Sequence, residues 1–111
     1  MDVNEYQKLA LTTLNPNLSN RDVLINGVMG LCGESGEAIE IVKKHLAQGH
    51  DLDKESLAVE LGDIAWYLAE TATAIGYSLL TILQMNLSKL QQRYPQGFDV
   101  RHSVEREEAK S

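Results

Sequence analysis

Apolar residues recur every three or four positions along most of the chain, which is the spacing of one face of an α-helix. Capping residues, glycine and proline divide this pattern into four helical stretches. We expect helices over approximately residues 2–14, from 19 or 20 to 48, from after 53 to near 76, and from after 78 to before 95. No segment alternates with period two for long enough to predict a strand. The pattern therefore predicts an all-α, four-helix bundle-like fold in a single domain over residues 1–111, with residues 98–111 as a loop and charged tail.

The third stretch is apolar on two sides. Its first apolar stripe holds Leu57, Leu61, Ile64, Leu68 and Ile75, and the opposite side holds Val59, Trp66 and Ala69. Three residues lie on the strip between these sides: Glu60, Asp63 and Tyr67. A helix that is apolar on two sides is expected to be buried on both, so the two carboxylates should be partly buried and need a partner. The apolar area also exceeds what one short chain readily covers, which predicts a homodimer or homotetramer.

The second stretch carries glycine at every third position, at Gly27, Gly30, Gly33 and Gly36. Each glycine inside a helix costs about 0.5–1 kcal/mol relative to alanine. Close approach of another helix or of a ligand is the usual reason for such glycines, and we expect one here.

Composition limits the possible partners. The chain has 111 residues, a formal net charge of −6 and a pI of about 4.9. This balance disfavours binding to duplex nucleic acid or to a membrane surface, both of which need a basic face. The single cysteine, Cys32, excludes an intrachain disulfide, and the first residues lack the apolar core of a signal peptide. We therefore expect a cytoplasmic protein.

Two carboxylate pairs carry the candidate chemistry. Glu34 and Glu37 are three residues apart, as are Glu60 and Asp63, so each pair projects from one face of its helix. Each pair could grip one hard cation, and oxygen ligands alone favour Mg²⁺, or Mn²⁺, over Zn²⁺. Spacing alone leaves two interpretations open, because a Glu-x-x-Glu pair is often a solvated helix face. The apolar surroundings of Glu60 and Asp63 favour the metal site.

The longer motifs resemble a known family. The segments GESGEA at residues 33–38 and ELGDIAWYL at 60–68 resemble those of MazG-like nucleotide pyrophosphohydrolases. The segments NLSKL at 86–90 and RYPQGF at 93–98 look like the last helix of that family and its exit. The resemblance covers about residues 20–106.

This resemblance implies an all-α fold that assembles as a dimer or a dimer of dimers. It also implies Mg²⁺-dependent hydrolysis of a nucleoside or deoxynucleoside triphosphate to the monophosphate and pyrophosphate. By matching position, the metal ligands would be Glu34, Glu37, Glu60 and Asp63. The general base is predicted to be Glu37, although the pattern does not distinguish it from the other three carboxylates.

Further residues are predicted to bind the substrate. Asn86, Lys89 and Arg93 share one helix face and look like the family's substrate-contacting face, with Lys89 or Arg93 answering phosphate charge. A solvent-exposed polar face explains these three equally well. Tyr67, on the carboxylate strip, is a better candidate than Trp66 for stacking a base, although an aromatic residue at helical spacing is more often part of a core.

Two alternative functions stay open. The first is phosphoribosyl-ATP pyrophosphohydrolase, a related activity on the same architecture that also releases pyrophosphate. The second is a non-catalytic helical oligomer or regulatory module with a vestigial site. The presence of all four carboxylates argues against the second alternative.

Overall fold

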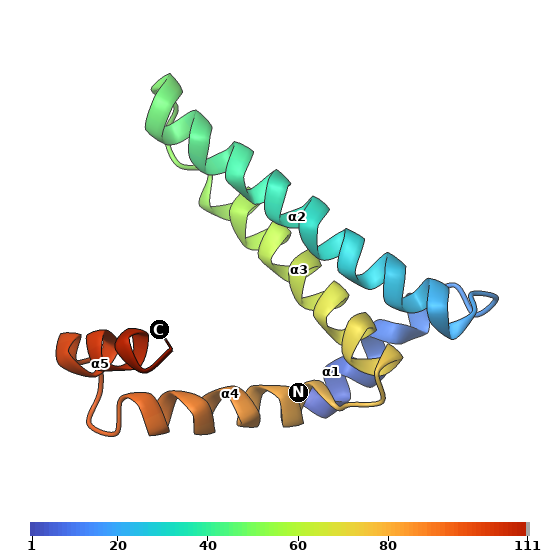
Figure 1. Ribbon diagram of the computed structural model, residues 1–111. Helices are drawn as coiled ribbons and strands as arrows, with labels where there is room; N and C mark the ends of the chain where they lie inside the picture. Colours follow the sequence, from blue (N-terminus) through green and yellow to red (C-terminus); the bar gives the residue numbers. More distant parts are fainter. Residues whose placement is uncertain (111) are drawn as a thin grey trace. The chain divides into compact units, whose positions relative to one another are not determined.

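The computed structural model describes residues 1–110, and the side chains of residues 1–106 (Figure 1). The elements are α1 (Val3–Ala10), the 3-10 turn η1 (Leu11–Thr13), α2 (Asn20–Gln48), α3 (Lys54–Ala74), α4 (Leu79–Arg93) and α5 (Val100–Lys110). The described residues contain no strand, which confirms the predicted all-α class. Over the same residues, no helix has the length and apolar character needed to cross a membrane.

Local capping explains where the helices begin and end. The side chains of Asp2, Ser19 and Asp53 each accept a hydrogen bond from the backbone N–H three residues later, at 2.8–3.1 Å. These bonds satisfy donors that a helix N-terminus otherwise leaves unpaired. Of the two candidate caps for the second helix, Ser19 is the one used. Gly49 ends α2 with a φ of 74°, a left-handed conformation that favours glycine.

The predicted loop and tail at residues 98–111 is wrong over residues 100–110, which form α5. The Asp99 carboxylate accepts a hydrogen bond from the Arg101 backbone N–H at 2.8 Å and so caps this helix. Arg101 and Glu105 also form an ion pair of 3.0 Å across one turn. Such short-range polar contacts leave little hydrophobic pattern, which is why the periodicity did not reveal the helix. Residue 111 lies outside the described residues.

The chain divides into two compact units at Leu79, and the prediction of a single domain remains a prediction. In the first unit, α2 and α3 lie side by side and antiparallel, and they make most of the contacts between elements (Figure 1). Helix α1 and η1 pack against α3. The side chain of Gln7 fastens α1 there, because it donates to the Thr73 hydroxyl and accepts from the Leu79 backbone N–H.

The second unit contains most of α4 together with α5. In the turn between these helices, the rings of Tyr94 and Phe98 lie 5.4 Å apart, centroid to centroid.

Helices α2 and α3 approach closely where α2 carries glycine. A β-carbon placed on Gly27 would overlap the Thr71 side chain, and one placed on Gly30 would overlap the Tyr67 ring. The expected close approach is therefore confirmed at these two positions. A β-carbon on Gly33 or Gly36 would meet open space in this structure, so close packing within the chain does not explain these two glycines.

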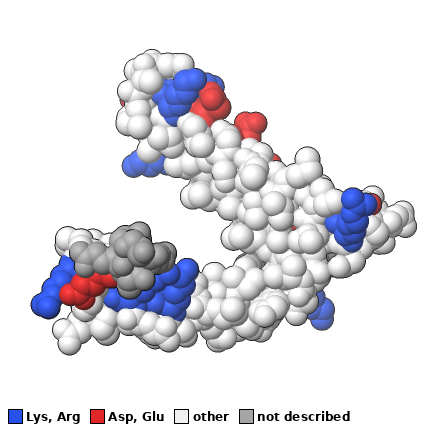
Figure 2. Space-filling view, in the orientation of Figure 1, with Lys and Arg blue, Asp and Glu red and all other residues white. Residues whose placement is uncertain are grey.

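The buried apolar core of the described residues is small, and it consists of Val23, Ala69, Ala72 and Leu79. The predicted first stripe of α3 is largely outside it, since Leu61 is 56% exposed and Ile75 is 53% exposed. On the strip between the two sides, Glu60 and Tyr67 are half-buried, whereas Asp63 is exposed, so the expectation that both carboxylates are partly buried is wrong for Asp63. The expectation that both apolar sides of this helix are buried therefore fails within the single chain. Figure 2 shows that the middle of the α2–α3 hairpin is mostly uncharged on the visible face.

Candidate metal centre and substrate pocket

Three of the four predicted metal ligands come together between α2 and α3. One carboxylate oxygen from each of Glu34, Glu60 and Asp63 lies within 4.8 Å of the other two. Glu60 and Asp63 are one helical turn apart on α3, and Glu34 faces them from α2. The antiparallel register that pairs Gly30 with Tyr67 brings Glu34 opposite Asp63 one turn further along.

Glu60 lies among other negatively charged side chains. A hydrogen bond shared with Glu34, partial burial, and the negative charges of Glu34, Asp63 and Glu37 together raise the pKa of Glu60 to about 7. The Oε2 atom of Glu60 is buried and has no hydrogen-bond partner among the described side chains. A buried carboxylate oxygen without a donor is costly, so a ligand that supplies positive charge would stabilise this group of carboxylates.

The fourth predicted ligand, Glu37, does not belong to this tight group. Its side chain is exposed on α2, one turn beyond Glu34. It is still close enough for its negative charge to contribute to the raised pKa of Glu60. Its role as a ligand or as the general base therefore remains a prediction.

The donor set fits a hard divalent cation. Glu34, Glu60 and Asp63 offer only oxygen atoms, which suit Mg²⁺ or Mn²⁺ better than a thiophilic metal. Such an ion would supply the positive charge that the buried Oε2 atom of Glu60 lacks. A cation would also relieve the mutual repulsion of the three carboxylates.

The carboxylates adjoin a pocket of about 390 Å³ lined by Glu34, Asp63, Trp66 and Tyr67. The two aromatic rings meet edge to face, with centroids 5.1 Å apart and planes at 87°. Tyr67 thus lies beside the carboxylates, and its role in binding the substrate remains a prediction. Trp66, which we expected to be an ordinary core residue, also lines the pocket and is only half-buried.

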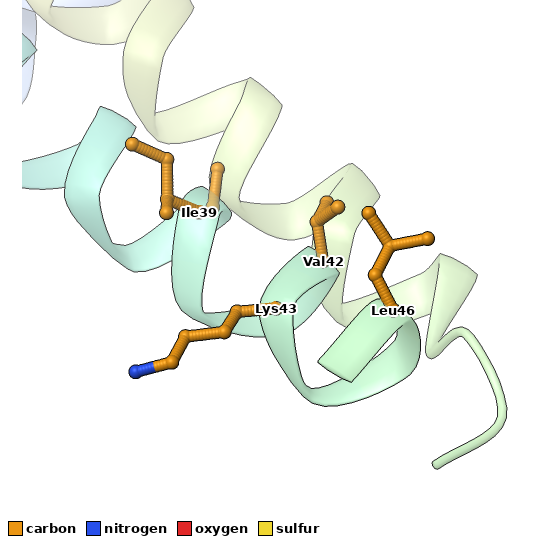
Figure 3. A pocket seen from close by; sticks show the side chains of 5 residues that line it. Ile39, Val42, Lys43 and Leu46 are labelled. Carbon is orange, nitrogen blue, oxygen red and sulfur yellow. The ribbon is translucent and has the colours of Figure 1, made fainter. Parts of the chain in front are cut away.

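A separate groove lies on the C-terminal half of α2 and is lined by Ala38, Ile39, Val42, Lys43 and Leu46. Figure 3 shows Ile39, Val42 and Leu46 projecting to one side, with the Lys43 amine pointing away from them. This groove is apolar and offers no carboxylate, hydroxyl or imidazole. It suits packing rather than chemistry.

The sequence interpretation missed a buried polar pair on the two helices that carry the carboxylates. Glu70 has no exposed surface, and its two carboxylate oxygens accept hydrogen bonds from the Asn26 amide at 3.0 and 2.9 Å. A signal for it was present, because Glu70 follows Asp63 by seven residues and so lies on the same helical strip.

The predicted substrate-contacting residues of α4 lie in the second unit. Asn86 and Lys89 are exposed there, and Arg93, the last residue of the helix, is half-buried. Their part in a substrate site remains a prediction.

The sequence of the chain is similar to a known protein family and to a phage protein. Residues 26–98 match the family model described as the MazG nucleotide pyrophosphohydrolase domain. The Gene 37 protein of Mycobacterium phage L5 is 41% identical over 73 residues, which cover 62% of this chain and 64% of that protein. No solved structure matches the chain. The family match spans more than half of the chain and includes all four carboxylates, so this protein belongs to the MazG nucleotide pyrophosphohydrolase domain family.

Proposed function

We propose that this protein hydrolyses a nucleoside or deoxynucleoside triphosphate, with Mg²⁺, to the monophosphate and pyrophosphate. The observation that carries the proposal is the convergence of the Glu34, Glu60 and Asp63 carboxylates beside a pocket walled by two aromatic rings. Family membership supports pyrophosphohydrolase chemistry in general. The triphosphate substrate and the metal are inferred from the carboxylates and the pocket.

Each residue of the centre has a role in this proposal. Glu34, Glu60 and Asp63 would hold the divalent cation, which when bound neutralises phosphate charge and makes a water molecule more acidic. Glu37 stands outside this tight group with an exposed carboxylate, so it is free of the shortest contacts and can accept the proton of the attacking water. This position supports Glu37 as the general base.

The remaining predicted residues would bind the rest of the substrate. Lys89 and Arg93 supply positive charge for phosphate oxygens, and Asn86 supplies an amide on the same helix face. Tyr67 lines the pocket next to Asp63 and would contact the nucleoside.

We also propose that the protein works as a homodimer or homotetramer. The support is the small core of the described residues, set against the exposed apolar side chains of Ile39, Leu46 and Leu61, at 63%, 76% and 56%. The apolar groove that includes Ile39 and Leu46 is one surface a second copy could cover. Light scattering at micromolar concentration tests this proposal, and a monomeric mass would contradict it.

The activity is tested with purified protein and a panel of ribo- and deoxyribonucleoside triphosphates, with phosphoribosyl-ATP included. Ion-exchange chromatography and a pyrophosphate assay identify the products with Mg²⁺ and with EDTA. We expect monophosphate and pyrophosphate in equal amounts, and no product in EDTA. Diphosphate with orthophosphate would contradict the reaction type, and cleavage of phosphoribosyl-ATP alone would identify the alternative substrate.

A further inference from the structure

We propose that Trp66 forms the nucleobase-contacting wall of the pocket, and that the N-terminal segment α1–η1 sets the position of this wall. The inference rests on the proposed function, because it assumes that a nucleotide occupies the pocket. It assigns a substrate-recognition role to a part of the chain that precedes the family match, which begins at residue 26.

The indole of Trp66 is fastened from outside its own helix. Its Nε1–H donates to the Ala10 backbone carbonyl and to the Thr13 hydroxyl, each at 2.9 Å. Both acceptors belong to the α1–η1 segment. A donor held by two acceptors fixes the plane of the ring, so the N-terminal segment determines how the indole faces the pocket.

The N-terminal segment is itself held firmly against α3. The Gln7 side chain donates to the Thr73 hydroxyl at 2.9 Å and to the Tyr77 carbonyl at 3.2 Å, and it accepts from the Leu79 N–H at 2.7 Å. These bonds join residues about 70 positions apart in sequence. The α1–η1 segment that holds Trp66 is therefore itself fixed within the first unit.

The second ring of the wall is fixed from the other side. Tyr67 meets Trp66 edge to face, and its own ring lies against Gly30 of α2, where a β-carbon would overlap it. The aromatic pair is thus held between η1 and α2. Rigid aromatic side chains bind a flat ligand with little loss of side-chain freedom, which suits a recognition surface.

The pocket and a nucleotide have matching chemistry. The pocket combines two carboxylates, Glu34 and Asp63, with two aromatic rings in one lining. A nucleotide combines phosphates, which reach carboxylates through a cation, with a base that stacks on or abuts aromatic rings. The rings offer a flat apolar surface that a base can contact and a bare phosphate chain cannot.

Trp66 is the only tryptophan of the chain, so its fluorescence reports on this wall alone. We would titrate the Mg²⁺-loaded protein with nucleoside monophosphates and, separately, with ribose 5-phosphate, which lacks a base. We expect saturable quenching by at least one monophosphate and no change with ribose 5-phosphate. A monophosphate that inhibits the enzyme but leaves the fluorescence unchanged would overturn the proposal.

Inhibition by the two products separates recognition from folding. Trp66→Leu should weaken inhibition by the monophosphate about tenfold or more and leave inhibition by pyrophosphate within about twofold. A merely structural role for Trp66 would weaken both inhibitors together, and that result would also overturn the proposal.

The N-terminal anchor has a matched control in the neighbouring threonine. Both hydroxyls donate to a carbonyl three residues earlier, Thr12 to Leu9 and Thr13 to Ala10, but of the two only Thr13 also accepts from the Trp66 indole in the described part of the chain. We expect Thr13→Val to raise KM for the triphosphate about threefold to tenfold with kcat within about twofold, and Thr12→Val to change neither. Equal effects from both variants would exclude the anchoring role.

These outcomes are distinguishable from failure of the proposed function. If the wild-type protein hydrolyses no triphosphate, the proposed reaction fails, while the fluorescence titration still decides whether Trp66 faces a base. If hydrolysis proceeds with no base-dependent effect at Trp66, only the present inference fails.

Discussion

The fully buried Glu70 carboxylate on α3 is paired with the Asn26 side chain on α2. The Asn26 amide nitrogen donates to both carboxylate oxygens of Glu70, at 3.0 and 2.9 Å. This pair joins the same two helices that carry Glu34 and Asp63. Sliding one helix against the other would break the pair and separate those carboxylates. The Asn26–Glu70 pair therefore fixes the register on which the candidate metal centre depends.

The first prediction concerns this pair. Asn26→Leu should lower the free energy of unfolding by about 1–3 kcal/mol, because it leaves the buried Glu70 carboxylate without its donor. Glu70→Gln should cost less, since the glutamine Oε1 can still accept a hydrogen bond from the Asn26 Nδ2 and no carboxylate is left without a donor. Urea unfolding followed by circular dichroism measures both. Equal stability of wild type and Asn26→Leu would mean that water or another group satisfies Glu70.

The second prediction concerns pH. The folded-state pKa of Glu60 is raised from 4.5 to about 7, so the folded protein binds this proton more tightly than the unfolded chain does. Its stabilising contribution is fully present below pH 4.5 and is lost as pH rises from 4.5 to about 7. The metal-free protein should therefore lose stability across that window.

Magnesium binding should show the opposite trend, because the cation competes with the proton on Glu60. We expect Mg²⁺ to bind about tenfold more weakly at pH 6 than at pH 8. Isothermal titration calorimetry at several pH values measures this, and Glu60→Gln is the control in which the pH dependence should flatten. An affinity independent of pH in wild type would remove Glu60 from the metal site.

The third prediction compares two glycines of α2. Gly30→Ala should destabilise the protein by about 1–3 kcal/mol, because its β-carbon would overlap the Tyr67 ring. Gly33→Ala meets open space in the same helix and should stabilise the chain by about 0.5–1 kcal/mol through helix propensity alone. Chemical unfolding of both variants checks the contrast. If Gly33→Ala is instead destabilising, a second copy of the chain packs against that position.

The fourth prediction separates charge from packing at Asp63. Asp63→Asn should abolish activity and leave the metal-free protein as stable as wild type or more so, because one of three mutually repelling carboxylates is removed. Saturating Mg²⁺ should stabilise wild type by about 1–3 kcal/mol and the variant much less. Thermal melts with EDTA and with Mg²⁺ measure both effects. A variant that melts well below wild type in EDTA and responds equally to Mg²⁺ would make Asp63 a structural residue.

Local physics made several features readable from the sequence. Helix ends follow from Ser19, Asp53 and Gly49, because capping depends on residues within one turn of each other. The all-α class follows from the same periodicity, and the family assignment follows from motifs on α2 and α3. The three-residue spacing of Glu60 and Asp63 places both on one helix face, whatever the tertiary contacts of that helix are.

Other features depend on contacts between distant segments, which spacing cannot report. Only the antiparallel register of α2 and α3 brings Glu34 to Glu60 and leaves Glu37 outside the tight group. The same packing buries Glu70 against Asn26. Trp66 became a pocket residue because η1, some 53 positions earlier, holds its indole.

The sequence by itself determined the helical stretches up to residue 93, the family and the set of carboxylates, since each of these depends on residues a few positions apart. The tertiary structure decided which carboxylates converge, which polar pair is buried and which ring faces the pocket. The physical reason is that side-chain direction is a local property of a helix, whereas the partner that a side chain meets depends on the register between helices. That register is set here by the contacts of Gly27 and Gly30 with Thr71 and Tyr67, together with the buried Asn26–Glu70 pair.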